Sequence, residues 1–478
     1  MTQSAEPSRT PFSKSSGITD TERYLEQLCE RNFLSFWSYP RPFRDQGGNK
    51  EICDLVVVMG DDAIIFSDKH CSLTPKKTLE IDWQRWFRSA VQAGAGQAWG
   101  AERWFRDHPH RVFLNPECTE RFPVPLPAPD RARYHLVVTV HGVAAACQTM
   151  LGGTGSLVLR SDTRGLEAHT EPFVIGDLDL SRSFVHVFDD VTLEIVMSTL
   201  DTAADFIRYL SQKELLFRSR TILAAGEENL LAFYLARVDN TGGHAFVFGS
   251  DHDAVVIDDT WWSHFRTSQE RRAQREHDEV SYVWDRLIER FAEHALKGSQ
   301  YFATAPPVTS AEIILRFMAA EPRLRRRYLA GAFIDALEQT PPNLRRLRVV
   351  PRQFADEPMY VFLLFPWRDD RSEEQNRAVR RKYLEACVHV AKLKYSNAID
   401  IIGIATESGI AHTDRSEDAV YVDARTWSVE DEEYARELQR DLDILTAEQA
   451  TSTAIVEYPV ERQAGSTLPF VRSKHPTE

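Results

Sequence analysis

Residues 50–72 read KEICDLVVVMGDDAIIFSDKHCS and contain two short apolar segments separated by a turn. The first segment, Leu55–Met59, is an unbroken apolar run, which is typical of a strand buried on both faces. Gly60-Asp61-Asp62 supplies turn residues, and a second apolar run covers 63–66. The pattern predicts a β-hairpin whose second strand ends in Ser67-Asp68-Lys69-His70.

Charged side chains lie at the ends of both predicted strands. Asp54 precedes the first strand, and Asp68 and Lys69 close the second. Because a buried strand does not tolerate an unpaired charge, these residues need a partner. Carboxylates that hold a divalent cation, with a lysine near the attacking water, would provide one. We therefore expect Asp54 and Asp68 to bind Mg²⁺ or Mn²⁺ and Lys69 to be catalytic.

This arrangement resembles the PD-(D/E)xK nuclease superfamily, in which an acid on one strand and an acid-x-lysine on the next bind magnesium. Asp54 matches the first acid and Lys69 the lysine, but Ser67 stands where the second acid is expected. Two arrangements accommodate this departure. A β-bulge could bring Asp68 and Lys69 into one site. Alternatively, Asp68 and His70 share one face of the strand, and His70 replaces the lysine.

The resemblance also implies supporting residues on two helices. Residues 22–33 are expected to form a helix before the hairpin, and Glu26 or Glu30 on it would join the metal site. Residues 82–105 are expected to form a helix after the hairpin, and Gln97 on it would support catalysis. Residues 108–114 are expected to form a turn and another strand, which would complete the order strand, strand, helix, strand that the nuclease core requires.

Length and composition predict a multidomain α/β protein. The chain has 478 residues, which is more than one core usually holds. An N-terminal restriction-endonuclease-like mixed sheet flanked by helices is expected, followed by mixed α/β regions. The predicted divisions are a disordered tail (1–18), a nuclease-like domain (19–122), a proline-rich linker (123–130), a mixed α/β middle domain (131–305), a C-terminal α/β domain with basic helices (306–449) and a loose tail (450–478).

The net charge of −14 argues against a generally basic nucleic-acid coat, so any such contact must be local. Basic residues do concentrate in the C-terminal part, where they could hold phosphates. Solvated helix faces paired with nearby acids are the alternative interpretation. The candidates are Arg345, Arg346, Arg348, Arg377, Arg380, Arg381 and Lys382.

Scattered cysteines and the absence of a long apolar run or signal peptide predict a cytoplasmic protein that does not enter a membrane. We carry two functional hypotheses from this sequence. The first is a magnesium- or manganese-dependent endonuclease, for which DNA is favoured over RNA as the expected substrate; its layout resembles that of anti-phage defence effectors. The second is a non-catalytic scaffold that keeps a nuclease-like fold and binds nucleic acid, a protein partner or a second copy of itself.

Overall fold

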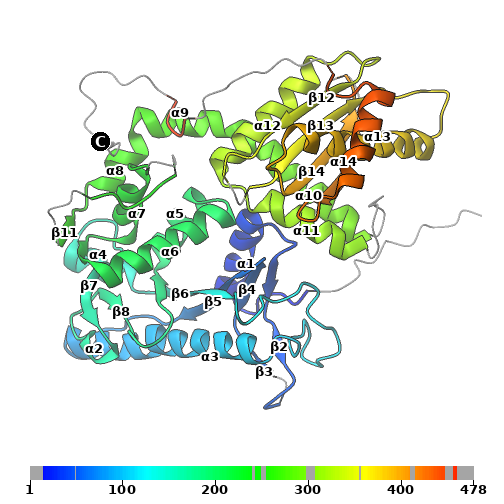
Figure 1. The fold of residues 1–478 in the computed structure, drawn as a ribbon. Coiled ribbons are helices and arrows are strands. Elements are labelled where there is room, and N and C mark those ends of the chain that lie inside the picture. The colour runs from blue at the N-terminus through cyan, green and yellow to red at the C-terminus, as the bar shows by residue number, and fades with distance from the viewer. Residues whose placement is uncertain are drawn as a thin grey trace, which may run out of the picture. The chain divides into compact units, whose positions relative to one another are not determined.

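The computed structural model describes residues 14–48, 50–239, 243–248, 254–297, 307–354, 357–409, 415–446 and 456–459 (Figure 1). The chain forms two compact units. The N-terminal unit extends to Glu276 and includes the short segment 456–459, and the C-terminal unit begins at His277. Most of the predicted tails at 1–18 and 450–478 lie outside the described residues. The predicted mixed α/β class is confirmed.

The N-terminal unit is built on a mixed five-stranded sheet in the order β1-β4-β5-β6-β9. The predicted hairpin is confirmed, because β4 and β5 pair antiparallel around the turn. Strand β1 pairs antiparallel with β4, whereas β6 is parallel to β5 and β9 is parallel to β6. The strands are Ser38–Pro40 (β1), Leu55–Met59 (β4), Asp62–His70 (β5), Arg133–His141 (β6) and Val185–Phe188 (β9).

The sheet corrects two expectations. The strand expected within 108–114 is replaced by an isolated bridge at Phe113, and β6 takes its place beside β5. Strand β6 follows the proline-rich segment 123–130, so the sheet continues across the predicted linker. Proline marks a chain break in helix or strand, but it does not reveal which strands pair afterwards. The compact units divide at Glu276 instead.

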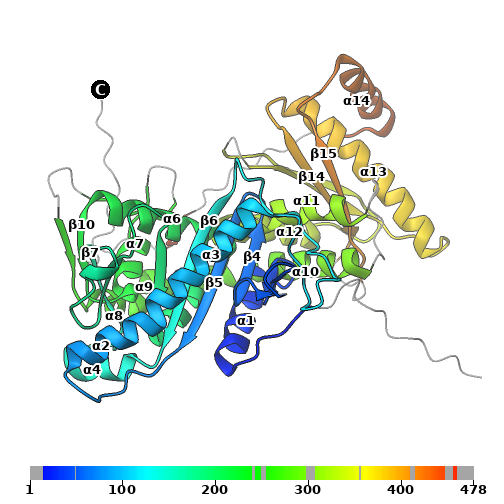
Figure 2. The ribbon, with the colours of Figure 1, turned by 90° about the horizontal axis from the view of Figure 1, so that it is seen from below.

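A long helical segment crosses from β5 to β6 and covers one face of both strands (Figure 2). It comprises α2 (Leu79–Phe87), a π-helical turn (Arg88–Gln92) and α3 (Ala93–Asp107). A Cβ atom on Gly94 would lie 2.6 Å from a methyl carbon of Val138 on β6. Glycine at this position therefore lets α3 approach the sheet closely.

The opposite face of the sheet packs on α1 (Asp20–Phe33) and α6 (Ala203–Ser219). Helix α1 starts with a capping box between Thr19 and Glu22, and its buried face includes Phe33. The rings of Phe33 on α1 and Phe206 on α6 both lie against Phe66 of β5, with ring centroids 6.5 and 6.4 Å away. Strand β5 is thus buried between helices on both faces, which explains its continuous apolar run.

A second sheet in the N-terminal unit has the order β11-β10-β7-β8. Its strands are Val158–Arg164 (β7), Val174–Asp177 (β8), Thr221–Ala224 (β10) and Ala254–Ile257 (β11). A short antiparallel pair, Phe43–Arg44 (β2) and Lys50–Glu51 (β3), precedes β4. The remaining helices of this unit are Ala144–Leu151 (α4), Asp190–Thr199 (α5), Glu227–Leu235 (α7), Trp261–Thr267 (α8) and Gln269–Asp278 (α9), the last of which ends just beyond the division.

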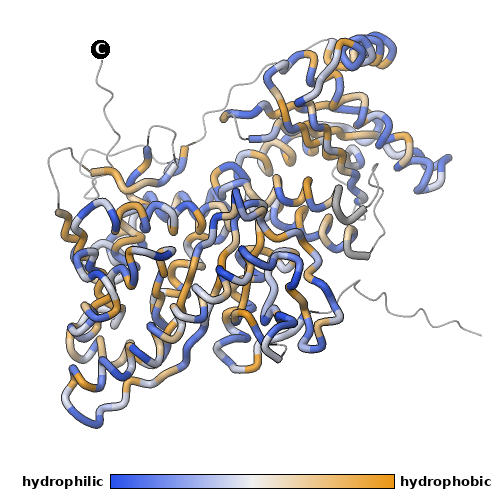
Figure 3. The backbone as a smooth tube through the Cα atoms, turned by 60° about the horizontal axis from the view of Figure 1, so that its bottom comes forward, coloured by the Kyte–Doolittle hydropathy of each residue, from blue (hydrophilic) through white to orange (hydrophobic). Residues whose placement is uncertain are grey.

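The C-terminal unit contains the sheet β12-β13-β14-β15. Strands β13 and β14 are parallel and are joined by α13, so these three elements form a βαβ unit. Figure 3 shows these strands as largely apolar and the helices as mixtures of polar and apolar turns. The elements are Tyr282–Lys297 (α10), Pro307–Ala319 (α11), Arg323–Glu338 (α12), Arg346–Val350 (β12), Met359–Phe365 (β13), Glu373–Lys394 (α13), Asp400–Glu407 (β14), Asp418–Asp423 (β15) and Val429–Leu442 (α14).

Helices cover both faces of this sheet. Val361 and Leu363 of β13 pack with Leu384 and Val388 of α13 on one face. On the other face the ring of Trp284 from α10 meets Tyr360 at a centroid distance of 5.2 Å. Among the described helices of the whole chain, none has the length and apolarity needed to cross a bilayer.

The sheet of the N-terminal unit makes a truncation prediction. A fragment that starts at residue 131 loses β1, β4 and β5, and it exposes the apolar edge of β6. We expect this fragment to aggregate on expression, whereas a fragment spanning 277–455 should be soluble and should unfold cooperatively in urea. A soluble, cooperatively folded 131–478 fragment would contradict the strand pairing described above.

Candidate active site

Asp54 lies immediately before β4 with only 7% of its surface exposed. Its Oδ2 atom accepts a hydrogen bond from the main-chain N–H of Asp68 at 2.6 Å. The Lys69 ammonium lies 3.4 Å from the same oxygen, and the side-chain amide of Gln97 lies 3.4 Å from Oδ1. The antiparallel register of β4 and β5 brings these groups together, because Leu55 stands opposite Phe66.

The Lys69 ammonium is surrounded by oxygen atoms. Besides Asp54, it donates to the main-chain oxygen of Asp68 at 3.0 Å and to Oε1 of Gln97 at 2.6 Å. The Ser67 hydroxyl also donates to Gln97 Oε1, at 2.8 Å. Helix α3 therefore delivers Gln97 onto the face of β5 that carries Ser67 and Lys69. Four residues singled out in the sequence therefore lie together: Asp54, Ser67, Lys69 and Gln97.

The Asp68 side chain lies on the opposite face of β5. The strand pairs with β6 without a bulge, so successive side chains alternate between faces. The Asp68 carboxylate accepts hydrogen bonds from Thr21 of α1 and from Thr139 and His141 of β6. Burial opposes its ionisation, but these hydrogen bonds outweigh burial and hold the pKa of Asp68 below its usual range. The predicted pairing of the Asp54 and Asp68 carboxylates is thus corrected: Asp68 reaches the site only through its main chain.

His70 does not replace the lysine in this geometry. Its side chain is exposed, and its ring stacks on that of His141 with centroids 5.8 Å apart. The histidine that contacts Asp68 is His141, whose Nε2 lies 2.7 Å from the carboxylate. The sequence left two arrangements open: a β-bulge that brings Asp68 and Lys69 into one site, and His70 in place of the lysine. The structure has neither, because β5 is regular and Lys69 itself lies beside Asp54.

The two glutamates predicted on the first helix face a different lysine. Glu26 accepts a hydrogen bond from the main-chain N–H of Gly17 at 3.0 Å. Burial raises the pKa of Glu30, and the nearby charge of Lys14 opposes that increase. Burial in turn lowers the pKa of Lys14 to about 8 against the attraction of both glutamates. Among the described residues, neither Glu26 nor Glu30 hydrogen-bonds to Asp54, and the charges of both act on Lys14 instead.

A second carboxyl group near Asp54 escaped the sequence reasoning. Glu51, on β3, accepts a hydrogen bond from Nε of Arg41 at 2.8 Å. Burial raises the pKa of Glu51, and although Arg41 opposes the increase, the charge of Asp54 and a hydrogen bond with it contribute further. The main-chain N–H of Arg41 donates to the Asp54 carbonyl at 2.9 Å, which keeps the two acids together. The sequence feature that could have identified Glu51 is its position three residues before Asp54.

The oxygen atoms around Lys69 are the ligand type that Mg²⁺ and Mn²⁺ prefer. They include the Asp54 carboxylate, the Asp68 carbonyl and the Gln97 amide oxygen, with the Glu51 carboxyl nearby. Within the described residues, no group of three or more His, Cys, Asp or Glu side chains could hold a metal ion. A cation here would rely on two carboxylates, completed by main-chain oxygen, water and substrate phosphate.

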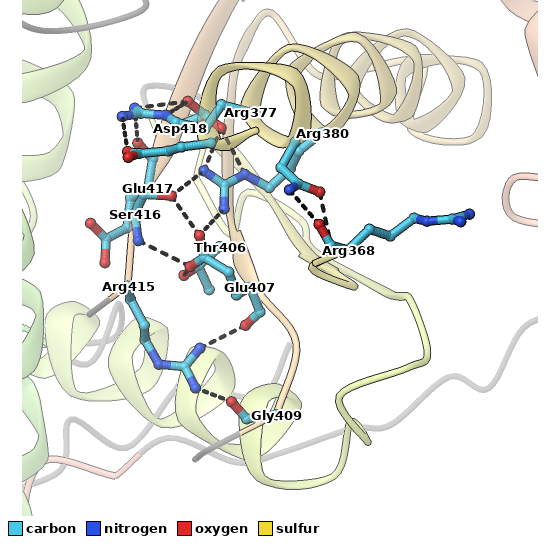
Figure 4. Close-up of polar contacts among 12 residues, drawn as sticks. Arg368, Arg377, Arg380, Thr406, Glu407, Gly409, Arg415, Ser416, Glu417 and Asp418 are labelled. Atoms are coloured by element: carbon cyan, nitrogen blue, oxygen red, sulfur yellow. Dashed lines mark hydrogen bonds and ion pairs between the residues drawn. The ribbon is translucent and has the colours of Figure 1, made fainter. Parts of the chain in front are cut away.

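The predicted basic residues of the C-terminal unit differ in burial. Figure 4 shows Arg377 and Arg380 among the acidic residues that they contact. Arg380 is 2% exposed and donates to Glu407 and Asp418 at 2.7 Å each. Arg377 also contacts Asp418, at 3.1 Å. Acids within the unit therefore pair with both arginines. Arg380 is nevertheless buried, whereas the alternative interpretation placed it on a solvated helix face.

The other candidates lie nearer the surface and have weaker partners. Arg345 stacks over the Tyr383 ring, Arg346 contacts Gln339, and Arg348 and Arg381 lie beside Asp335 and Glu385. Lys382 is exposed. Any local basic surface in this region would consist of Arg345, Arg346, Arg348, Arg381 and Lys382.

Comparison with known proteins identifies no relative: no protein-family model, no curated protein and no solved structure matches this chain. Its function is therefore argued from its own residues.

The buried ion pairs of Arg380 generate a stability prediction. Arg380→Met leaves Glu407 and Asp418 buried without their cation, so we expect a loss of roughly 3–5 kcal/mol in the free energy of unfolding of the C-terminal unit. Arg346→Met, an exposed position on the same sheet, should change it by less than about 0.5 kcal/mol. Urea unfolding followed by circular dichroism would measure both. Equal effects would contradict the burial of this cluster.

Proposed function

We propose that the N-terminal unit is a metal-dependent nuclease that hydrolyses phosphodiester bonds of nucleic acid. The observation that carries the proposal is the convergence of Asp54, Lys69 and Gln97 at one end of β5. The order α1-β4-β5-α3-β6 supports it, because the resemblance implies a helix before the hairpin and then the order strand, strand, helix, strand. The assignment of function rests on the site and not on the fold.

Each residue of the candidate active site has a role in this proposal. Asp54 and Glu51 would hold the cation, together with the Asp68 carbonyl. Gln97 orients the Lys69 ammonium, which lies 2.6 Å from its amide oxygen. Lys69 then stabilises the negative charge that develops on the phosphoryl oxygens. When bound, the metal would lower the pKa of its water and polarise the phosphate.

A second candidate function is a non-catalytic scaffold, and one observation favours it. Ser67 replaces an acid, and the Lys69 ammonium already lies beside Asp54 at 3.4 Å. With Arg41 against Glu51, two cations balance two carboxylates without a metal. A cation would then have to compete with Lys69 and Arg41 for the same oxygens, which lowers metal affinity.

The nuclease proposal makes a direct prediction for cleavage. Asp54→Asn and Lys69→Met should each reduce the cleavage of DNA or RNA in Mg²⁺ or Mn²⁺ by at least about 100-fold, a loss typical of removing one electrostatic group from a reacting centre. The fold should survive, because asparagine and methionine have volumes close to those of the aspartate and lysine that they replace. A gel-based assay on labelled duplex and single-stranded substrates would measure this.

Lys50→Met is a matched control, because Lys50 is an exposed lysine in the same unit. It should cleave like the wild-type chain. Wild-type cleavage by both Asp54→Asn and Lys69→Met would contradict the proposed nuclease function. A wild-type chain that is inactive in both metals would favour the non-catalytic scaffold.

The metal site makes a separate prediction. Glu51→Gln should weaken Mn²⁺ binding by about tenfold or more, because one of two carboxylates is lost. Ser67→Asp adds a carboxylate on the Lys69 face and should strengthen binding. Isothermal titration calorimetry measures both changes without reference to turnover. Asp45→Asn, which removes a carboxylate paired with Arg111, is the control and should be neutral. Unchanged affinity in Glu51→Gln and Ser67→Asp would remove Glu51 and the Ser67 face from the site.

A further inference from the structure

His141 closes a hydrogen-bonded cluster on the face of β5 opposite Lys69. Its Nε2 lies 2.7 Å from Oδ1 of Asp68, and its Nδ1 lies 2.5 Å from Oδ1 of Asp190, the first residue of α5. The second oxygen of Asp190 accepts the main-chain N–H of Gly142 at 2.9 Å. The ring is thereby held from both sides, and its side chain is only 11% exposed.

Both nitrogen atoms of the His141 ring are engaged with carboxylates. A histidine in this state has no free lone pair to accept a proton or to bind a metal. Burial opposes its protonation, but hydrogen bonds with Asp190 and Asp68 outweigh burial and raise the pKa of His141 to about 9. A direct role as a general base is therefore excluded by geometry, and the ring acts as a fixed cationic bridge between two strands and a helix.

Asp68 connects this cluster to the proposed active site across the strand. Its carboxylate is held by His141, Thr139 and Thr21, while its main-chain N–H donates to Asp54 Oδ2 on the other side. That N–H lies 2.6 Å from the Asp54 carboxylate. The contacts of Asp54 with Lys69 and Gln97 are both longer, at 3.4 Å. The main-chain N–H of Asp68 therefore makes the shortest of these three contacts with the Asp54 carboxylate and helps to fix its position.

We propose that His141 is a positioning residue for the nuclease site. By holding the Asp68 carboxylate it fixes the Asp68 peptide, and this peptide fixes Asp54. The inference rests on the proposed function, and it adds to it a residue that never touches substrate or metal. In this proposal the Asp68 side chain links His141 to the active site, although it points to the face of β5 opposite Lys69.

A second histidine–aspartate pair on the same strands provides a matched control. His135 of β6 lies 2.9 Å from Asp62 of β5, and its side chain is 7% exposed. The pair stands at the far end of β5 from Asp54, and no described contact joins the two. Losing either histidine removes a buried bond between the same two strands, but only His141 is linked to the active site.

The experiment compares His141→Leu, His141→Gln and His135→Leu in the full-length chain. We expect His141→Leu to lower kcat at least about tenfold with KM changed by less than about twofold, and to weaken Mn²⁺ affinity by a factor similar to that for kcat. The side-chain amide of Gln in His141→Gln can still donate to Asp68 and should restore most of the loss. His135→Leu should retain wild-type kcat and Mn²⁺ affinity. Urea unfolding checks that the two leucine variants lose comparable stability.

Hydrogen–deuterium exchange of the peptide containing Asp68 gives a readout that does not depend on activity. Exchange at that segment should accelerate in His141→Leu and remain slow in His135→Leu. If His141→Leu fails to fold, Asp190→Asn loosens the ring from its exposed side and should show the same pattern more weakly.

Wild-type kcat, Mn²⁺ affinity and exchange in His141→Leu would overturn this inference, as would equal losses in His135→Leu. The failure of the proposed function is distinguishable, because it is defined by Asp54→Asn. An inactive Asp54→Asn with an unaffected His141→Leu overturns only the role of His141. Wild-type cleavage by Asp54→Asn would overturn the proposed nuclease function. In that case, slow hydrogen–deuterium exchange at Asp68 in His141→Leu would still overturn the proposal that His141 positions the Asp68 peptide.

Discussion

The alternation of side chains along β5 controls the chemistry of the N-terminal unit. A strand without a bulge sends Ser67 and Lys69 to one face and Asp68 to the other. Because helices cover both faces, neither set of polar groups can turn toward solvent, and each must find partners where it lies. Ser67 and Lys69 find Gln97 on α3, whereas Asp68 finds His141 and two threonines.

The close approach of α3 is the second requirement of the site. Gly94 lies against Val138, and its position one turn before Gln97 brings that side chain onto Lys69. A larger residue at position 94 would force the helix away from the sheet. The reach of Gln97 to the ammonium therefore depends on a residue that carries no chemistry of its own.

Charge in the C-terminal unit illustrates why composition is a weak guide to a binding surface. Arg326 of α12 is 1% exposed and pairs with Asp285, and Arg380 of α13 pairs with Glu407 and Asp418. Buried arginines of this kind hold the unit together through charge-assisted hydrogen bonds with carboxylates. Their high density in the sequence reflects internal ion pairs as much as any external partner.

The amino-acid sequence was sufficient for the local features of this protein. The apolar runs predicted β4 and β5, and turn residues placed the hairpin between them, because these properties depend on neighbours within a few positions. The convergence of Asp54, Lys69 and Gln97 also followed from the sequence, through the spacing of the motif that they resemble.

Tertiary structure decided which of the remaining groups meet. Asp68 of β5 lies opposite Thr139 of β6, which is 71 positions later in the sequence, and the two side chains are hydrogen-bonded. No local sequence pattern predicts a pairing between residues so far apart. The same packing brings Glu51 beside Asp54, places Lys14 near Glu26 and Glu30, and buries Arg380 against Glu407 and Asp418. Strand pairing and helix packing depend on contacts between distant segments, so the partner of a charged side chain is settled only when the whole chain has folded.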